Sequence, residues 1–248
     1  RFNTTGYGNT AMGLDSLFSN TTGYGTVSIG CGALRSAVCV QEDTAIGCGA
    51  LCSYSCGYGG FNTAVGAKAA CGITAGMQFS VAVGYRSMGL GATGGYSNTA
   101  VGAYSIAANT TGINNTAMGH LALSSNATAG YLTAIGVEAL CAHVTNGPNT
   151  AIGHHAMKTS ATGYYNIAIG YGALCSHVGG NGNVAVGDYG LSSDTGGFFN
   201  TAVGYGSLRG NTTGINNTAV GTCSLRFNTT ANYNTAVGTY GLSNNTTG

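Results

Sequence analysis

Charged side chains are scarce in this sequence, and their scarcity argues against several classes of partner. The 248 residues include seven Lys and Arg and six Asp and Glu, which gives a formal net charge of +1. A surface this neutral has no electrostatic attraction for nucleic acid or for anionic lipid. No window approaches 18 consecutive apolar residues either. We therefore expect no nucleic-acid partner and no membrane insertion.

Groups that carry catalysis are equally sparse. The six acidic residues are scattered along the chain, so no carboxylate pair suggests glycoside hydrolysis. The Gly-rich stretches lack the Lys-Ser/Thr of a phosphate loop, and no Gly-x-Ser-x-Gly stands in a strand–turn–helix context. The nine Cys do not recur with zinc-finger spacing, and the five His are expected at the surface rather than at a metal site. We expect no enzyme, no cofactor and no metal.

What the sequence has in abundance is a glycine-marked repeat. The stretch Asn-Thr-Ala-Val-Gly stands intact five times, and near copies bring the total to fourteen. The glycines that end the copies are separated by steps of 17, 17, 19, 18 and 18 residues and then by eight steps of 17. A period of this kind is the signature of a repeat architecture. The intact copies are Asn62–Gly66, Asn98–Gly102, Asn200–Gly204, Asn217–Gly221 and Asn234–Gly238.

The 17-residue unit is numbered here from its Asn, so that the glycine is position 5. Position 2 is β-branched in every copy and position 4 is Val, Ile or Met, which predicts a short strand over positions 1 to 5. The Asn-Thr-Thr-Gly tail predicts a turn. We therefore predict an all-β fold, a parallel β-solenoid of about fourteen 17-residue coils stacked about 4.8 Å apart. We expect residues 1–248 to form one repeat domain, uncapped at both ends and part of a longer fibre.

The strand has two faces, and the sequence favours one assignment of them. Positions 2 and 4 are expected to point into the coil, with position 4 and the Leu of position 9 filling a thin core. Position 3, which is Ala in thirteen copies and Ser28 in one, then points outward. Small residues on an exposed face indicate close packing against a neighbouring chain. The alternative places Ala and Gly inside a very flat coil and Thr and Val outside.

Stacked coils place like residues above like, which predicts ladders of identical side chains. Position 1 is expected to form an Asn ladder whose amides hydrogen-bond along the stack. Position 6 carries three tyrosines, Tyr85, Tyr171 and Tyr205, which are candidate glycan contacts, although Tyr also covers a sheet surface without any ligand. The clearest members of the Asn ladder are Asn98, Asn115, Asn149, Asn166, Asn183, Asn200, Asn217 and Asn234.

Six of the nine cysteines fall in register between adjacent coils. Same-phase Cα atoms lie about 4.8 Å apart, within the range that a disulfide requires. Three disulfides are therefore candidates, and they would imply an oxidising compartment. The alternative is that these residues are small buried apolar side chains. The candidate pairs are Cys31 with Cys48, Cys39 with Cys56, and Cys52 with Cys71.

Several copies of the repeat resemble a known family. Ser80–Gly84, Asn166–Gly170 and Asn183–Gly187 are similar to the head repeats of trimeric autotransporter adhesins, and the fuller unit Asn200–Gly214 also resembles repeat arrays of phage tail fibres. The resemblance implies a left-handed parallel β-roll, three chains side by side, and binding to a host surface or matrix. The chain departs from it in having a longer unit and no coiled-coil stalk, membrane anchor or chaperone-like segment.

Three functions are compatible with these features. The first is a structural or adhesive fibre of a cell or virion surface, extracellular and homotrimeric, with surface glycans as a further partner. The second is a subunit that stacks head to tail into an open filament. The third is an ice-binding solenoid that uses the Thr of position 2. A trimer predicts small-residue faces buried between chains, whereas ice binding predicts a flat exposed Thr face and a monomer.

Overall fold

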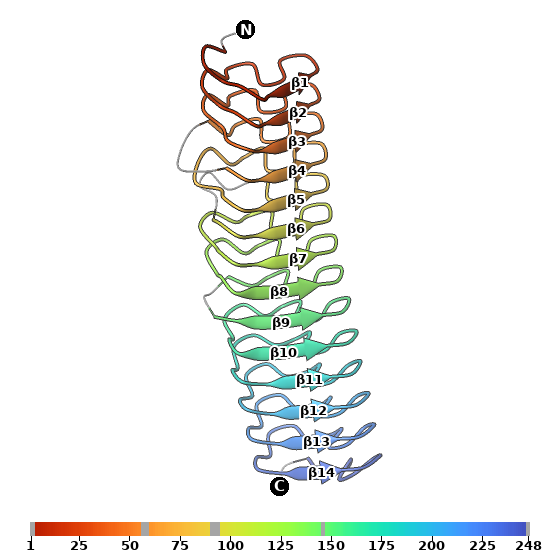
Figure 1. Ribbon diagram of the computed structural model, residues 1–248. Helices are drawn as coiled ribbons and strands as arrows, with labels where there is room; N and C mark the ends of the chain where they lie inside the picture. The colour runs from red at the N-terminus through yellow and green to blue at the C-terminus, as the bar shows by residue number, and fades with distance from the viewer. Residues whose placement is uncertain (1–2, 56–59, 90–94, 145–146, 247–248) are drawn as a thin grey trace. The chain divides into compact units, whose positions relative to one another are not determined.

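The computed structural model describes residues 3–55, 60–89, 95–144 and 147–246. The described residues contain strands and turns but no helix, so the prediction of an all-β fold is confirmed. The chain divides into two compact units, residues 1–128 and 129–248. Each unit is a parallel β-solenoid in which one short strand marks each coil (Figure 1).

In the first unit each strand pairs in parallel with the next, and position matches position. Val27 of β2 lies beside Thr44 of β3, and Ala64 of β4 lies beside Ala82 of β5. The longer steps of 19 and 18 residues leave this register intact. The strands are β1 (Thr10–Met12), β2 (Val27–Ile29), β3 (Thr44–Ile46), β4 (Thr63–Val65), β5 (Val81–Val83), β6 (Thr99–Val101) and β7 (Thr116–Met118).

The second unit repeats the same arrangement with a uniform 17-residue step. Thr201 of β12 pairs with Thr218 of β13, and Val203 pairs with Val220. Its first three strands are one residue longer at the start. The strands are β8 (Leu132–Ile135), β9 (Asn149–Ile152), β10 (Asn166–Ile169), β11 (Val184–Val186), β12 (Thr201–Val203), β13 (Thr218–Val220) and β14 (Thr235–Val237).

The favoured assignment of the strand faces is wrong, and the alternative is right. Position 3 is buried in every strand from β2 to β14, while positions 2 and 4 are half-buried or exposed. The coil is so flat that position 3 meets position 8 across it. The hydroxyl of Ser28 donates to the carbonyl of Ala33, and a Cβ added at Gly190 would lie 3.5 Å from the Cβ of Ala185. Only small side chains fit between such closely spaced walls.

The rest of the core comes from position 9, which carries the largest buried aliphatic side chains. Leu140, Leu174 and Leu208 are each fully buried. All three have φ between 47° and 51°, in the left-handed region that L-residues seldom occupy. Packing therefore holds a sharp bend at this position, at a local backbone cost of roughly 1–2 kcal/mol per residue.

Candidate functional site

The Asn ladder of position 1 lies inside the coil. Asn183, Asn200 and Asn217 are fully buried, and each side-chain oxygen accepts a hydrogen bond from the backbone N–H of the next Asn, over 2.9–3.0 Å. Each Nδ2 also donates to the carbonyl at position 15 of its own coil, as from Asn200 to Gly214 over 2.7 Å. The ladder therefore ties adjacent coils together and closes each coil on itself.

A second buried polar column stands at position 12, and the sequence interpretation took these residues only as part of a turn. The Nδ2 of Asn228 donates to the Oδ1 of Asn211 in the preceding coil, over 3.0 Å. Within its own coil, Asn211 donates to the Gly214 carbonyl, the same oxygen that Asn200 contacts. The regular recurrence of Asn at position 12 was the available signal. The two columns thus share acceptors and form one internal network.

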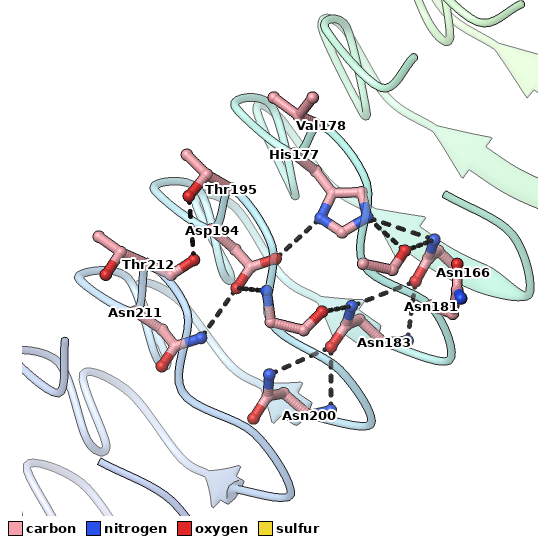
Figure 2. Close-up of polar contacts among 12 residues, drawn as sticks. Asn166, His177, Val178, Asn181, Asn183, Asp194, Thr195, Asn200, Asn211 and Thr212 are labelled. Carbon is pink, nitrogen blue, oxygen red and sulfur yellow. Dashed lines mark hydrogen bonds and ion pairs between the residues drawn. The ribbon is translucent and has the colours of Figure 1, made fainter. Parts of the chain in front are cut away.

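One rung of this second column is charged (Figure 2). His177 and Asp194 occupy position 12 of adjacent coils and are both fully buried, with His177 Nδ1 2.8 Å from Asp194 Oδ2. His177 Nε2 lies 2.8 Å from the carbonyl of Gly180, which can only accept, so Nε2 carries a proton. Asp194 Oδ1 accepts from the Gly197 N–H and from Asn211.

This geometry fits an ion pair. Asp194 Oδ1 accepts two hydrogen bonds, as a carboxylate does. An imidazolium at His177 would donate from both nitrogens, to Asp194 and to the Gly180 carbonyl. The surface position expected for the histidines is therefore wrong for His177, and also for His143, which is fully buried. Position 12 faces the interior, which the spacing alone did not show.

One coil of the first unit has ionisable residues in place of Asn in both columns. Position 1 there is Asp43 and position 12 is Tyr54, both fully buried. Asp43 Oδ1 accepts from the N–H and the Nδ2 of Asn62, while Oδ2 has no hydrogen-bond partner. Burial raises the pKa of Asp43 to about 6. The same burial, with Asp43 nearby, raises the pKa of the Tyr54 hydroxyl, which donates to the carbonyl of Met77.

The cysteines of the first unit fall into two groups. Cys52 and Cys71 form a disulfide with their Cα atoms 4.9 Å apart. Cys39 is also disulfide-bonded, and Cys56, the partner predicted for it, lies outside the described residues. The third predicted pair is wrong, because Cys31 and Cys48 are exposed free thiols. Coil spacing brings same-phase Cα atoms into range, but a bond also requires side chains that turn toward each other, and these two extend into solvent.

The strand face itself is an exposed surface of Thr and aliphatic side chains. At position 4, Ile169, Val203 and Val220 are 36–37% exposed. At position 2, Thr201 and Thr218 are half-exposed, and no hydrogen bond joins a position-2 Thr hydroxyl to another described residue. The position-13 hydroxyls differ, since they donate to the carbonyl one coil away, as from Thr195 to Thr212 over 3.1 Å. We call the position-2 and position-4 columns the strand face.

Aromatic rings line the edge of the coil that follows each strand. Tyr85, Tyr171 and Tyr205 are 43–50% exposed. In the second unit Tyr171 stacks on His154 at 5.2 Å and meets Tyr189 edge to face at 5.2 Å. Tyr205 also meets Tyr189 edge to face, at 6.2 Å. The candidate glycan contacts are therefore accessible but partly occupied by neighbouring rings.

No metal-binding cluster of three His, Cys, Asp or Glu side chains occurs in the part of the chain that the structure describes. Nor do these described ranges contain a helix that could cross a membrane. The chain matches no known protein family, no curated protein and no solved structure. Inference about function therefore rests on the strand face, its edge and the buried network.

Proposed function

We propose that the chain is a non-enzymatic structural and adhesive fibre segment of a cell or virion surface, in which copies of the chain associate through the strand face. The observation that supports this is the exposed column of position 4. All fourteen copies have Val, Ile or Met there, never a polar residue, and Val203 and Val220 are each 36% exposed. A contiguous column of solvent-exposed apolar side chains marks a contact surface.

A second copy of the same chain is the partner that fits best. The strand face repeats with every coil, so an identical face can match it coil by coil. The face carries no charge, and neighbouring copies therefore meet without burying an unpaired ion. Three copies arranged around an axis along the stack would close such a contact, as the resemblance to trimeric adhesin heads implies. The Cys52–Cys71 disulfide supports an extracellular location.

The native mass in solution tests this proposal. We expect about three times the 24.5 kDa of one chain. Val203→Glu with Val220→Glu should reduce that mass to one chain, because each copy would bury charge in the contact. Ser176→Glu with Ser193→Glu, which adds the same charge at exposed position 11, should leave it unchanged. A very large, heterogeneous mass would indicate head-to-tail filaments instead, and a wild-type monomer would contradict both forms of assembly.

Ice binding is the second candidate, and the free hydroxyls of position 2 favour it. Thr201, Thr218 and their equivalents form a regular column about 4.8 Å apart, with methyl groups beside them and no internal hydrogen bond. Four members of the column are Val or Ile instead of Thr, and they do not interrupt the exposed surface, since Ile167 is 39% exposed. Ice binding predicts a monomer whose solutions show thermal hysteresis, the gap between the freezing and melting points of ice. Thr218→Lys should abolish the hysteresis, whereas Thr212→Lys should leave it unchanged. A monomer without hysteresis would contradict it.

A further inference from the structure

Two cationic side chains of the first unit lie next to each other without an acidic partner. Lys68 and Arg86 both occupy position 7, in coils whose strands β4 and β5 are paired. The Arg86 N–H donates to the Ala67 carbonyl, so the two segments are adjacent. Their Cα atoms are therefore about one coil spacing apart, roughly 4.8 Å. Like charges at such a short separation repel each other.

Of the other four described cations, two have acidic partners and two, Arg209 and Arg226, lie over aromatic rings. Arg35 lies 3.7 Å from Asp15, and Lys158 forms an ion pair with Glu138. All six acidic residues belong to the described ranges, and none of them lies within ion-pair distance of Lys68 or Arg86. Lys68 and Arg86 are thus one of two adjacent couples of cations without an acidic partner among the described residues, and Arg209 and Arg226 are the other.

A surface hollow adjoins the two cations. Its volume is about 200 Å³, and its walls are Ser53, Lys68, Cys71, Gly72, Arg86 and Gly89. Cys71 belongs to the Cys52–Cys71 disulfide, which holds one wall in place. Lys68 and Arg86 supply only hydrogen-bond donors and Ser53 supplies a hydroxyl, and no carboxylate is among the described residues that line the hollow. This is the chemistry of an anion site.

An exposed aromatic ring lies next to one of the two cations. The Arg86 guanidinium carbon lies 5.6 Å from the centre of the Tyr85 ring, and that ring is 43% exposed. Tyr85 also meets Tyr104 edge to face, at 5.4 Å. A ring face next to two cations suits a ligand with both an apolar ring surface and an acidic group. A bare inorganic anion would use the cations alone.

We propose that this hollow binds the carboxylate or sulfate group of an acidic saccharide, with Lys68 and Arg86 contacting the anion and Tyr85 contacting the sugar ring. The site lies at position 7 and not on the strand face. It is therefore independent of whether copies of the chain associate, and a monomer and an assembly both test it. The carboxylate or sulfate of the ligand takes the place of an acidic side chain beside the two cations.

Binding of dextran sulfate, neutral dextran and sodium sulfate to the full chain tests the proposal. We expect binding of dextran sulfate and none of neutral dextran. Lys68→Gln with Arg86→Gln should weaken it at least tenfold, while Arg209→Gln with Arg226→Gln removes the same charge from another adjacent pair and should change it less than twofold. Those two arginines lie over the rings of Tyr189 and Phe227. If the first pair of substitutions unfolds the chain, Lys68→Gln alone replaces it with an expected loss of threefold or more.

Tyr85→Ala distinguishes a sulfated saccharide from free sulfate as the ligand. It should weaken the binding of dextran sulfate several-fold and leave the binding of sodium sulfate unchanged. Three results would overturn the proposal: equal losses in the two double variants, which indicate unspecific charge attraction; no binding of dextran sulfate; or sodium sulfate binding as tightly as dextran sulfate, which indicates an inorganic anion only. Each result stands apart from the native mass, so the fibre proposal succeeds or fails separately.

Discussion

His177 and Asp194 form a fully buried ion pair between adjacent coils, with Nδ1 and Oδ2 2.8 Å apart, at a position where the next two coils have Asn211 and Asn228. The pair makes the same contacts as the Asn residues that it replaces. His177 Nε2 donates to the position-15 carbonyl of Gly180, as Asn211 does to that of Gly214. The charged pair therefore replaces two Asn residues of the column, and we expect substitutions of its two members to have strongly coupled effects on stability.

Breaking this pair should cost more than removing it. His177→Ala leaves the Asp194 carboxylate buried without its cation, and we expect a loss of about 3–5 kcal/mol in the free energy of unfolding. Adding Asp194→Asn should recover most of that loss, because the double variant has no uncompensated charge. Urea unfolding of wild type, both single variants and the double variant gives the coupling energy. Additive effects would contradict the ionic assignment.

Asp43 should make the first unit less stable as the pH rises. Its pKa is raised by burial to about 6 in the folded chain, above an unfolded value of about 3.9. Between these values the folded state keeps a proton that the unfolded state has released, so stability falls as the pH rises from about 4 to about 6. The loss is on the order of 2–3 kcal/mol, at 1.4 kcal/mol per pKa unit.

Asp43→Asn should remove that pH dependence and stabilise the chain at pH 7. Asn is the usual residue of position 1, and it presents an amide where the carboxylate Oδ2 has no partner. Asn200→Asp is the converse variant and should introduce a similar loss with rising pH, since Asn200 is equally buried. Thermal unfolding from pH 4 to 7 measures both. An unchanged slope in Asp43→Asn would show that another group titrates.

The fold was predictable because its period is written directly in the sequence, whereas the direction of each side chain was not. Period-two alternation fixes that Ala202 and Val203 lie on opposite faces, but it does not say which face is inside. Hydrophobicity favoured Val203 inside. The flatness of the coil decided otherwise, and flatness follows from the bend at Leu208 and the closeness of positions 3 and 8. These are tertiary features that no local pattern reveals.

The buried polar residues show the same limit. The Asn ladder at position 1 was predicted from repetition alone. At position 12 the same repetition was assigned to a turn, although Asn211 and Asn228 are buried. His177 then seemed unrelated to a column of Asn, because only the structure shows that it makes the contacts of an Asn. Substitutions inside a repeat are thus best understood against the residue that the other coils have there.

The Cys52–Cys71 disulfide should stabilise the first unit and leave the stability of the second unit unchanged. It closes a 19-residue separation, for which chain-entropy estimates give about 3 kcal/mol. Cys52→Ser should therefore speed proteolytic cleavage between residues 40 and 90, and reductant should do the same to the wild type. Cys175→Ser changes a free thiol at the same position of the second unit and serves as the control. Equal protection of residues 40–90 in all four samples would contradict this stabilising effect.

Glycine at position 5 is required by the close approach of neighbouring coils. Gly204 has φ of +124°, and a Cβ there would lie 2.7 Å from the backbone carbon and oxygen of Gly221. Nothing flexible can move aside, because the obstacle is backbone that pairs the coils. We expect Gly204→Ala to cost on the order of 3–4 kcal/mol in the free energy of unfolding.

Gly206, two residues later, provides the matched control. Its φ of +59° is close to the 57° of Tyr189 at the same position of the preceding coil, and an added Cβ would meet only Cys223 Sγ, at 3.5 Å. Gly206→Ala should therefore cost about 1 kcal/mol. Urea unfolding of the two variants separates a steric requirement from a conformational preference. Equal costs would mean that backbone angle alone, and not the spacing of the coils, selects glycine at position 5.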